Sequence, residues 1–200
     1  MKWIKQTLLL LLFVSFSQAS IANTEAKDVV NSVNQNILKE LRANEARYAA
    51  NPNQLYTLVQ RELVPFIDFP SFSKLILAKY WRTASPAQQQ RFIRAFQGML
   101  MRTYTKSLLE FTHSELNIIR EVPGAKENLA KVYGEFSASS GQPKSHVIFE
   151  MRQGNNWKAY NITVNAFSLV KNFRTSFGRE INQFGLDGLI QRLEQNQVTE

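Results

Sequence analysis

The sequence predicts an α+β fold, in which helices occupy the first half of the chain and a sheet of about four to five strands follows. Apolar residues recur at spacings of three and four from residue 24 to residue 111, which is typical of helices that bury one face. Four short segments rich in β-branched and aromatic residues then lie between residues 116 and 164, and helical spacing returns after residue 168.

Residues 1–22 form a predicted signal peptide. Two lysines precede an apolar run over residues 8–16, and small residues follow it. The run is shorter than the roughly 18 residues that span a bilayer. We expect cleavage after Ala22, with Ala19 as the alternative site, and a single domain over residues 23–200.

The composition narrows the classes of function. Removal of the signal peptide takes two lysines and no acid, so the net charge falls from +8 to +6. A basic exported protein is attracted to anionic surfaces, including membranes, whereas export separates it from nucleic acid. The chain has no cysteine, which excludes disulfides and catalysis by a thiol.

The first helices are predicted from their apolar faces and their caps. A helix is expected over residues 24–49. Its apolar face carries Val30, Val33, Ile37 and Leu41. The next helix begins at Pro52 after Asn51, because proline suits the first helical position. The apolar link between Pro65 and Pro70 ends that helix and turns the chain.

Two more helices are predicted before the strands. A short one covers residues 71–81. The longest helix of the chain follows, because Ser85 and Gln88 have the spacing of a capping box with Pro86 between them. Its apolar positions continue as far as Phe111.

Strands are expected over residues 116–122, 129–137, 145–152 and 157–164, separated by turns rich in Gly, Pro, Ser and Asn. In the third strand, Val147, Phe149 and Met151 face one way and the residues between them face the other. The strands therefore suggest an antiparallel meander with one buried face. Two helices, over 168–183 and 186–195 with Gly185 between them, end the chain.

Catalytic patterns are scarce. His113 and His146 are isolated from other metal-ligating residues, and we predict no metal site. The sequence has neither a GxSxG motif nor a glycine-rich phosphate loop. Asp68 lies in an apolar link that suits a general base, but capping of the helix near Ser71 is the simpler interpretation.

The ordered set of these features resembles the MlaC, or toluene-tolerance, family of periplasmic phospholipid-binding proteins. The first half of the pattern comprises Pro65, Asp68, Trp81-Arg82, Ser85-Pro86, Phe92, Phe96 and Tyr104. The second half comprises Trp157-Lys158-Ala159-Tyr160, Ser168-Leu169-Val170, Phe173-Arg174, Phe177 and the run from Gly185 to Ile190. The resemblance covers nearly all of the predicted mature chain.

Two positions depart from the family pattern. Asn161 stands where the family usually has Asp, and Ala166 followed by Phe167 stands where Gly before an aliphatic residue is common. The change to Asn161 is mild for a group that forms hydrogen bonds. The bulk of Phe167 predicts a narrower or reshaped cavity.

The resemblance implies a twisted mixed or antiparallel sheet, similar to that of NTF2, packed against helices and enclosing a deep apolar pocket. It further implies a monomeric carrier, not an enzyme, that works without a cofactor in the periplasm of a Gram-negative bacterium. Its cargo is a glycerophospholipid, and its partners are an outer-membrane Mla lipoprotein–porin complex and an inner-membrane Mla ABC-transporter complex. Through them it maintains the lipid asymmetry of the outer membrane.

Candidate site residues follow from the large apolar side chains and the cations beside them. The candidates for the wall of the acyl-chain pocket are Trp81, Phe96, Tyr104, Phe149, Met151, Trp157, Tyr160 and Phe173. Several of them are expected to be plain core instead, because core packing is the commoner role of a large aromatic side chain. Arg174, and Lys171 with it, lie beside the apolar stripe of the helix over 168–183 and are the headgroup candidates. Two other classes stay open: a small isomerase or hydrolase with Asp68 as base, and a periplasmic chaperone.

Overall fold

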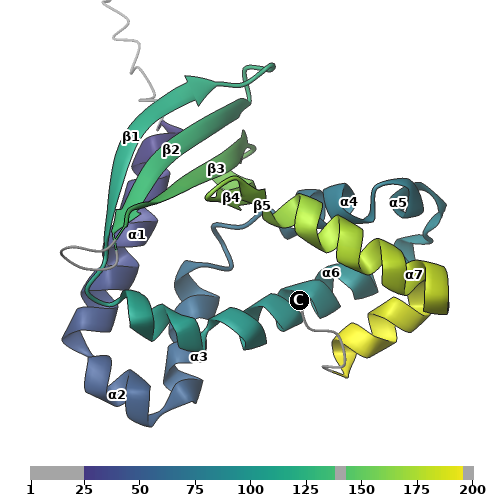
Figure 1. The fold of residues 1–200 in the computed structure, drawn as a ribbon, viewed down its shortest axis with the longest axis horizontal. Coiled ribbons are helices and arrows are strands. Elements are labelled where there is room, and N and C mark those ends of the chain that lie inside the picture. The colour runs from purple at the N-terminus through teal and green to yellow at the C-terminus, as the bar shows by residue number, and fades with distance from the viewer. Residues whose placement is uncertain (1–24, 138–142, 196–200) are drawn as a thin grey trace, which may run out of the picture.

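The computed structural model describes residues 25–137 and 143–195 (Figure 1). The predicted signal peptide, residues 1–22, lies outside the described residues. Within the described part of the chain, no helix is both long and apolar enough to cross a membrane. The elements follow the predicted order of helices, sheet and final helices.

The predicted helix over residues 24–49 consists of two helices, α1 (Ala26–Ala43) and α2 (Glu45–Ala50). They are separated at Asn44, where φ is −136°. The side-chain amide of Asn44 donates a hydrogen bond to the backbone carbonyl of Glu40 at 3.1 Å, a local bond that competes with the helix. Helix α3 (Pro52–Glu62) begins at the predicted proline.

Helix α4 (Phe69–Leu77) is capped by Asp68, whose carboxylate accepts a hydrogen bond from the backbone nitrogen of Ser71 at 3.0 Å. This contact confirms the capping interpretation of Asp68. The predicted helix over residues 71–81 is divided, because Ala78 adopts a φ of 48° and α5 (Lys79–Thr83) begins after it.

Helix α6 (Pro86–Tyr104) has the predicted capping box: the hydroxyl of Ser85 accepts from the Gln88 nitrogen at 3.2 Å, and the Gln88 amide oxygen accepts from the Ser85 nitrogen at 2.9 Å. The helical pattern does not continue unchanged to Phe111, because a 3₁₀ helix, η1 (Lys106–Phe111), follows. Residues three apart lie above one another in a 3₁₀ helix, so Leu108 and Phe111 share one side.

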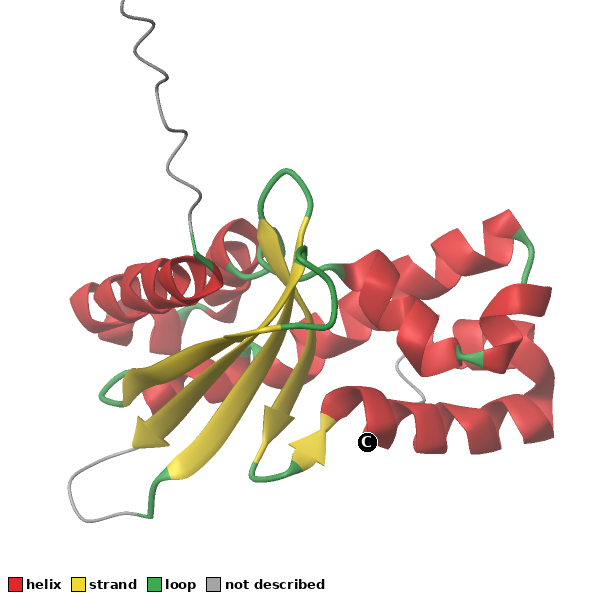
Figure 2. Ribbon diagram, turned by 90° about the horizontal axis from the view of Figure 1, so that it is seen from above, coloured by secondary structure: helices red, strands yellow, loops and turns green. Residues whose placement is uncertain are grey.

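The sheet is an antiparallel meander of five strands in the order β1-β2-β3-β4-β5 (Figure 2). The strands are β1 (Glu115–Pro123), β2 (Leu129–Ser137), β3 (Ser145–Gln153), β4 (Trp157–Val164) and the short β5 (Phe167–Ser168). Parallel pairing in the described residues is limited to a bridge between Ile67 and Ala159. Bulges interrupt β1 between Ile118 and Arg120 and the β3–β4 pair after Glu150, and they increase the local twist.

Helix α7 (Leu169–Glu194) follows β5 and is capped by Ser168, whose hydroxyl accepts a hydrogen bond from the Lys171 nitrogen at 3.3 Å. Gly185 interrupts it with φ 72° and ψ 172°. The last described part of the chain therefore consists of two helical segments separated at the predicted glycine.

The buried residues form separate clusters at the two ends of the molecule. Helix α1 runs along one face of the sheet, while α4, α6 and α7 lie together at the other end (Figures 1 and 2). In the helical end, Phe96 is fully buried and its ring contacts those of five other phenylalanines. These are Phe69, Phe72, Phe92, Phe173 and Phe177.

Candidate functional site

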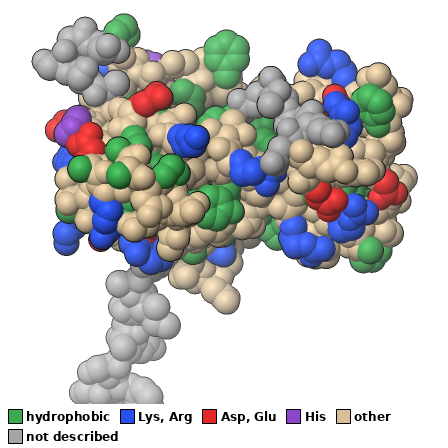
Figure 3. Space-filling view, turned by 90° about the horizontal axis from the view of Figure 1, so that it is seen from below, with side chains coloured by type: hydrophobic (Ala, Val, Ile, Leu, Met, Phe, Trp, Pro, Cys, Tyr) green, Lys and Arg blue, Asp and Glu red, His purple; other side chains and the backbone are tan. Residues whose placement is uncertain are grey.

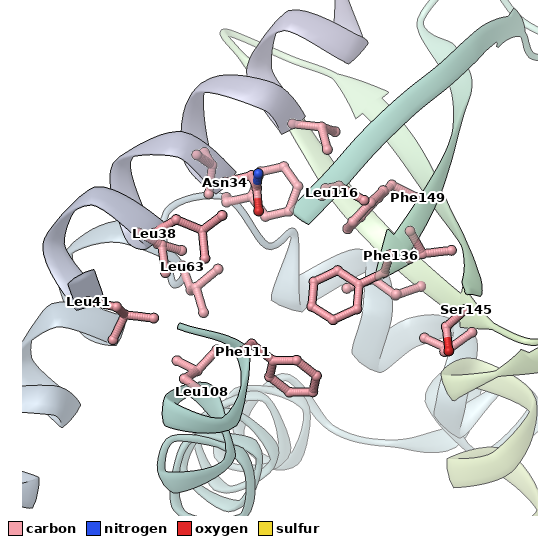
Figure 4. A pocket seen from close by; sticks show the side chains of 17 residues that line it. Asn34, Leu38, Leu41, Leu63, Leu108, Phe111, Leu116, Phe136, Ser145 and Phe149 are labelled. Carbon is pink, nitrogen blue, oxygen red and sulfur yellow. The ribbon is translucent and has the colours of Figure 1, made fainter. Parts of the chain in front are cut away.

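A cavity of about 460 Å³ lies between α1, the link after α3, η1 and one face of the sheet (Figure 4). The helices and the link contribute Val30, Val33, Asn34, Ile37, Leu38, Leu41, Leu63, Phe66, Leu108 and Phe111. The strands contribute Leu116, Phe136, Ser145, Val147, Phe149, Ile162 and Val164. Its volume falls within the range of typical ligand pockets, about 300–1,000 Å³.

One wall of the cavity is the apolar face of α1. Val30 packs at one end in a buried cluster with the sheet, and Leu41 packs at the other end in a cluster with α2 and α3. Because both ends of α1 are held by core, its middle turns span the cavity. The apolar stripe that predicted this helix therefore also lines the cavity. Leu38, which lies beside the stripe, is a further lining residue.

The opposite wall is the inward face of the sheet. The cross-strand pairs Phe136–Ser145, Val147–Val164 and Phe149–Ile162 all point into the cavity. Side chains alternate along a strand, so every second residue of β3 reaches this face, as the sequence predicts for Val147 and Phe149. Met151 points the same way but is buried in the cluster with α1, not at the cavity.

The lining of the cavity is almost entirely apolar. Fifteen of its seventeen lining side chains are apolar, and the other two are Asn34 and Ser145. The Ser145 hydroxyl accepts a hydrogen bond from the Asn165 side chain at 3.1 Å. The lining contains no acid, base or histidine, and no group of three metal-ligating side chains exists among the described residues.

The structure places one of the eight predicted wall residues, Phe149, on the cavity. Trp81, Phe96 and Phe173 belong to the helical end, where Phe96 and Phe173 are buried among other rings and Trp81 packs against them. Their size suggested a pocket, but close packing of the phenylalanines leaves them in a solid core.

The other four predicted wall residues also lie away from the cavity. Met151 and Trp157 are buried between the sheet and the start of α1. Tyr104 lies on α6 and is 36% exposed. Tyr160 lies on the outer face of the sheet, where the Arg152 guanidinium is 5.3 Å from its ring centre and burial raises the pKa of its hydroxyl. A role of these four residues in lipid binding stays a prediction, because none of them lines the cavity.

The two headgroup candidates lie on α7, outside the cavity lining. The Arg174 guanidinium donates two hydrogen bonds, at 2.6 and 2.9 Å, to the carbonyl of Leu75 near the end of α4. It therefore joins two helices and satisfies a carbonyl near a helix end. Lys171 is exposed on the first turn of α7. A headgroup role for either residue stays a prediction.

Phe167 does not narrow the cavity. It is 79% exposed and lies across the β4–β5 hairpin from Val164, which does line the cavity. The two turn residues, Asn165 and Ala166, have φ values of 47° and 70°, which match the twist of a tight hairpin. The expectation that Phe167 reshapes the cavity is therefore wrong, because the hairpin turns its ring outward.

The histidines and the surface charges form no further site in the described residues. His113 lies 3.3 Å from Glu45, and His146 lies 3.8 Å from Glu135, each at the surface. On the face seen from below, Lys and Arg side chains are spread over the whole width of the molecule and do not gather in one patch (Figure 3). The net positive charge is therefore diffuse on that face.

Comparison with known proteins finds a matching family model and similar proteins in other bacteria. A family model described as MlaC protein matches residues 31–195. The chain is 32% identical over 183 residues to the toluene tolerance protein ttg2D of Pseudomonas putida, covering 90% of this chain and 83% of that protein. It is 22% identical over 200 residues to the intermembrane phospholipid transport system binding protein MlaC of Haemophilus influenzae, covering 98% and 92%.

A solved structure shares the fold. The phospholipid-binding protein from Ralstonia solanacearum, in complex with a phospholipid, matches with a TM-score of 0.77 and 22% sequence identity. The match covers 86% of this chain and 96% of that one.

Proposed function

This chain belongs to the MlaC family, and from that premise we propose that it is a periplasmic phospholipid carrier. It encloses the acyl chains of a glycerophospholipid and shuttles the lipid between the outer-membrane and inner-membrane Mla complexes, which maintains outer-membrane lipid asymmetry. It is exported with loss of residues 1–22, uses no cofactor and leaves its cargo chemically unchanged.

The apolar cavity between α1 and the sheet is the observation that carries the proposal. A diacyl lipid in water exposes some thirty or more CH₂ groups, and burial of each is favourable by about 0.8 kcal/mol. A carrier must enclose most of that surface to hold such a lipid. A lining of fifteen apolar side chains with no ionisable group matches the apolar character of that surface.

The relatives support the same class of cargo. The Haemophilus influenzae relative is named for phospholipid transport, and the Ralstonia solanacearum structure contains a phospholipid. The isomerase or hydrolase alternative has less support, since the Asp68 carboxylate caps α4 and is not part of the cavity lining. A chaperone would bind unfolded polypeptide instead of lipid. The mass of the adduct distinguishes these two cases.

The proposal is tested by native mass spectrometry of the protein purified from the periplasm without detergent. We expect a stoichiometric adduct at phospholipid mass. Leu38→Trp, which fills the cavity, should lose the adduct, whereas Asn36→Trp on the exposed side of the same helix should keep it. A bare polypeptide that also takes up no phospholipid from vesicles, or an adduct of polypeptide mass, contradicts the proposal.

The export step has its own measurement. The intact mass of the periplasmic protein should correspond to a chain that begins at Asn23. A mass that includes residues 1–22 would contradict cleavage after Ala22. Transfer of labelled phospholipid from the loaded protein to membranes that contain each Mla complex, but not to membranes without them, tests the shuttle.

A further inference from the structure

Asn34 is a polar side chain in an otherwise apolar wall of the cavity. It lies in the middle of α1, between Val30 and Leu38 on the lining face. Its amide projects into the space between α1 and Leu116 (Figure 4). Within the described part of the chain it makes no hydrogen bond, unlike the Ser145 hydroxyl, which Asn165 already contacts.

Asn34 is half-buried, so a lipid that fills the cavity would displace water from its amide, which then needs another polar partner. It has two N–H donors and one acceptor, and a buried polar group without a hydrogen bond is unfavourable. A hydrocarbon chain has no atom that can form a hydrogen bond with the Asn34 amide. The ester carbonyl and phosphate oxygens of a glycerophospholipid accept hydrogen bonds and lie where the acyl chains end.

A polar hollow lies next to the cavity, against α1. It has a volume of about 490 Å³ and lies between α1 and β1, and Leu116 lines both the hollow and the cavity. Asn31, one turn before Asn34, also lines it. The hollow is lined by Lys27 and Arg120 and by Asp28 and Glu121. The Lys27 ammonium pairs with Glu25, and the Arg120 guanidinium lies 4.1 Å from the centre of the Tyr133 ring. A polar lining of this kind suits a headgroup and not an acyl chain.

We propose that Asn34 donates a hydrogen bond to an ester or phosphate oxygen of the bound glycerophospholipid, and that the headgroup leaves the cavity along the hollow between α1 and β1. The inference rests on the proposed function and adds the position and direction of the lipid. The boundary between tails and headgroup lies at the middle of α1.

The first test compares Asn34→Leu with Asn36→Leu, the same substitution on the exposed side of α1. One lost hydrogen bond should speed phospholipid transfer to acceptor vesicles about three- to tenfold in Asn34→Leu. Asn36→Leu should leave the rate unchanged, and Asn34→Gln, which keeps the amide, should restore part of the wild-type rate. Equal rates in wild type and both leucine variants overturn the inference.

The second test locates the headgroup directly. The chain has no cysteine, so a single introduced cysteine carries a single fluorophore. Asn117→Cys labels the hollow between α1 and β1, and Lys39→Cys labels a separate hollow near the other end of α1. A phospholipid with a nitroxide on its headgroup should quench the label at position 117 more strongly than the label at position 39.

The outcomes separate the two proposals. Equal quenching, or stronger quenching at position 39, overturns the headgroup path while the carrier function stands. If wild-type protein takes up no phospholipid in either assay, the proposed function is contradicted, and so is the inference that rests on it.

Discussion

The side-chain amide of Asn161 joins Glu150 to the first turn of helix α7. Its nitrogen donates to the Glu150 carboxylate at 2.7 Å, and its oxygen accepts from the Val170 backbone nitrogen at 3.1 Å. Lys131 approaches the same carboxylate at 2.9 Å from the neighbouring strand. Asn161 is buried, so this contact fixes where α7 leaves the sheet.

Asn161→Asp should destabilise the protein by about 1–3 kcal/mol at neutral pH. The change replaces the N–H donor with a second carboxylate beside Glu150, in a site where an unpaired polar group is unfavourable. Urea unfolding at pH 7 measures the effect. Asn155→Asp in the exposed β3–β4 turn is the control and should change the stability little. Equal stability of the two variants would contradict the structural role of Asn161.

Glu150 should make the stability depend on acid pH. Burial raises its pKa, but the hydrogen bonds from Asn161 and Lys131 outweigh that effect, so the pKa lies below its ordinary value of 4.5. A lowered carboxyl pKa stabilises the fold above the unfolded value, and this contribution is lost as the pH falls through the folded value. Wild type should therefore lose stability below about pH 4.5 more steeply than Glu150→Gln.

Denaturant unfolding at a series of pH values between about 6 and 3 tests this slope. Glu127→Gln, at an exposed turn, is the control and should follow wild type. If Glu150→Gln also follows wild type over this range, the hydrogen bonds to Glu150 do not contribute to stability.

Ala166→Gly should stabilise the protein by about 1 kcal/mol, because Ala166 has a φ of 70° and a left-handed backbone is unfavourable for a residue with a Cβ atom. Thermal unfolding measures the change. Ala125→Gly, in an exposed turn where φ is not positive, should instead be neutral or destabilising. A lower melting temperature for Ala166→Gly would show that the hairpin is not under this strain.

Phe96→Ala should reduce stability by about 3–5 kcal/mol, since Phe96 is fully buried among other rings. The folded fraction should nevertheless carry as much phospholipid as wild type, because Phe96 does not line the cavity. Phe96→Leu, which disturbs the core less, keeps this comparison possible if the alanine variant fails to fold. Loss of lipid from a folded Phe96→Leu protein would place the binding site at the helical end instead.

Arg174→Ala should cost about 1 kcal/mol of stability and leave phospholipid transfer unchanged. Its guanidinium contacts the Leu75 carbonyl and holds α7 against α4. Thermal unfolding and a vesicle transfer assay on the same variant measure both effects. A slower transfer with unchanged stability would instead support the headgroup role predicted from the sequence.

The local elements were predictable because short-range chemistry controls them. The capping box of Ser85 and Gln88, the cap at Asp68 and the interruption at Gly185 all depend on residues within a few positions of one another. The alternation in β3 similarly predicted that Val147 and Phe149 share a face. The division of the first predicted helix at Asn44 was missed, since apolar spacing continues across the break.

The wall of the cavity was not predictable in the same way. The spacing of a phenylalanine stripe along a helix is the same whether the rings pack against one another or line a cavity. The phenylalanines of α6 and α7 meet one another and close into a core. The facing side chains of α1 and the sheet leave the cavity between them, and buried clusters pack at both ends of α1.

The sequence by itself therefore determined the class of fold, the order of its elements and the family, because caps, turns and periodicity are local and the family pattern is a linear order of residues. Only the tertiary structure decided which apolar faces meet and which stay apart. That choice depends on long-range packing between α1, η1 and the strands. It puts the cavity between α1 and the sheet, where Phe149 is the one predicted wall residue among the lining residues.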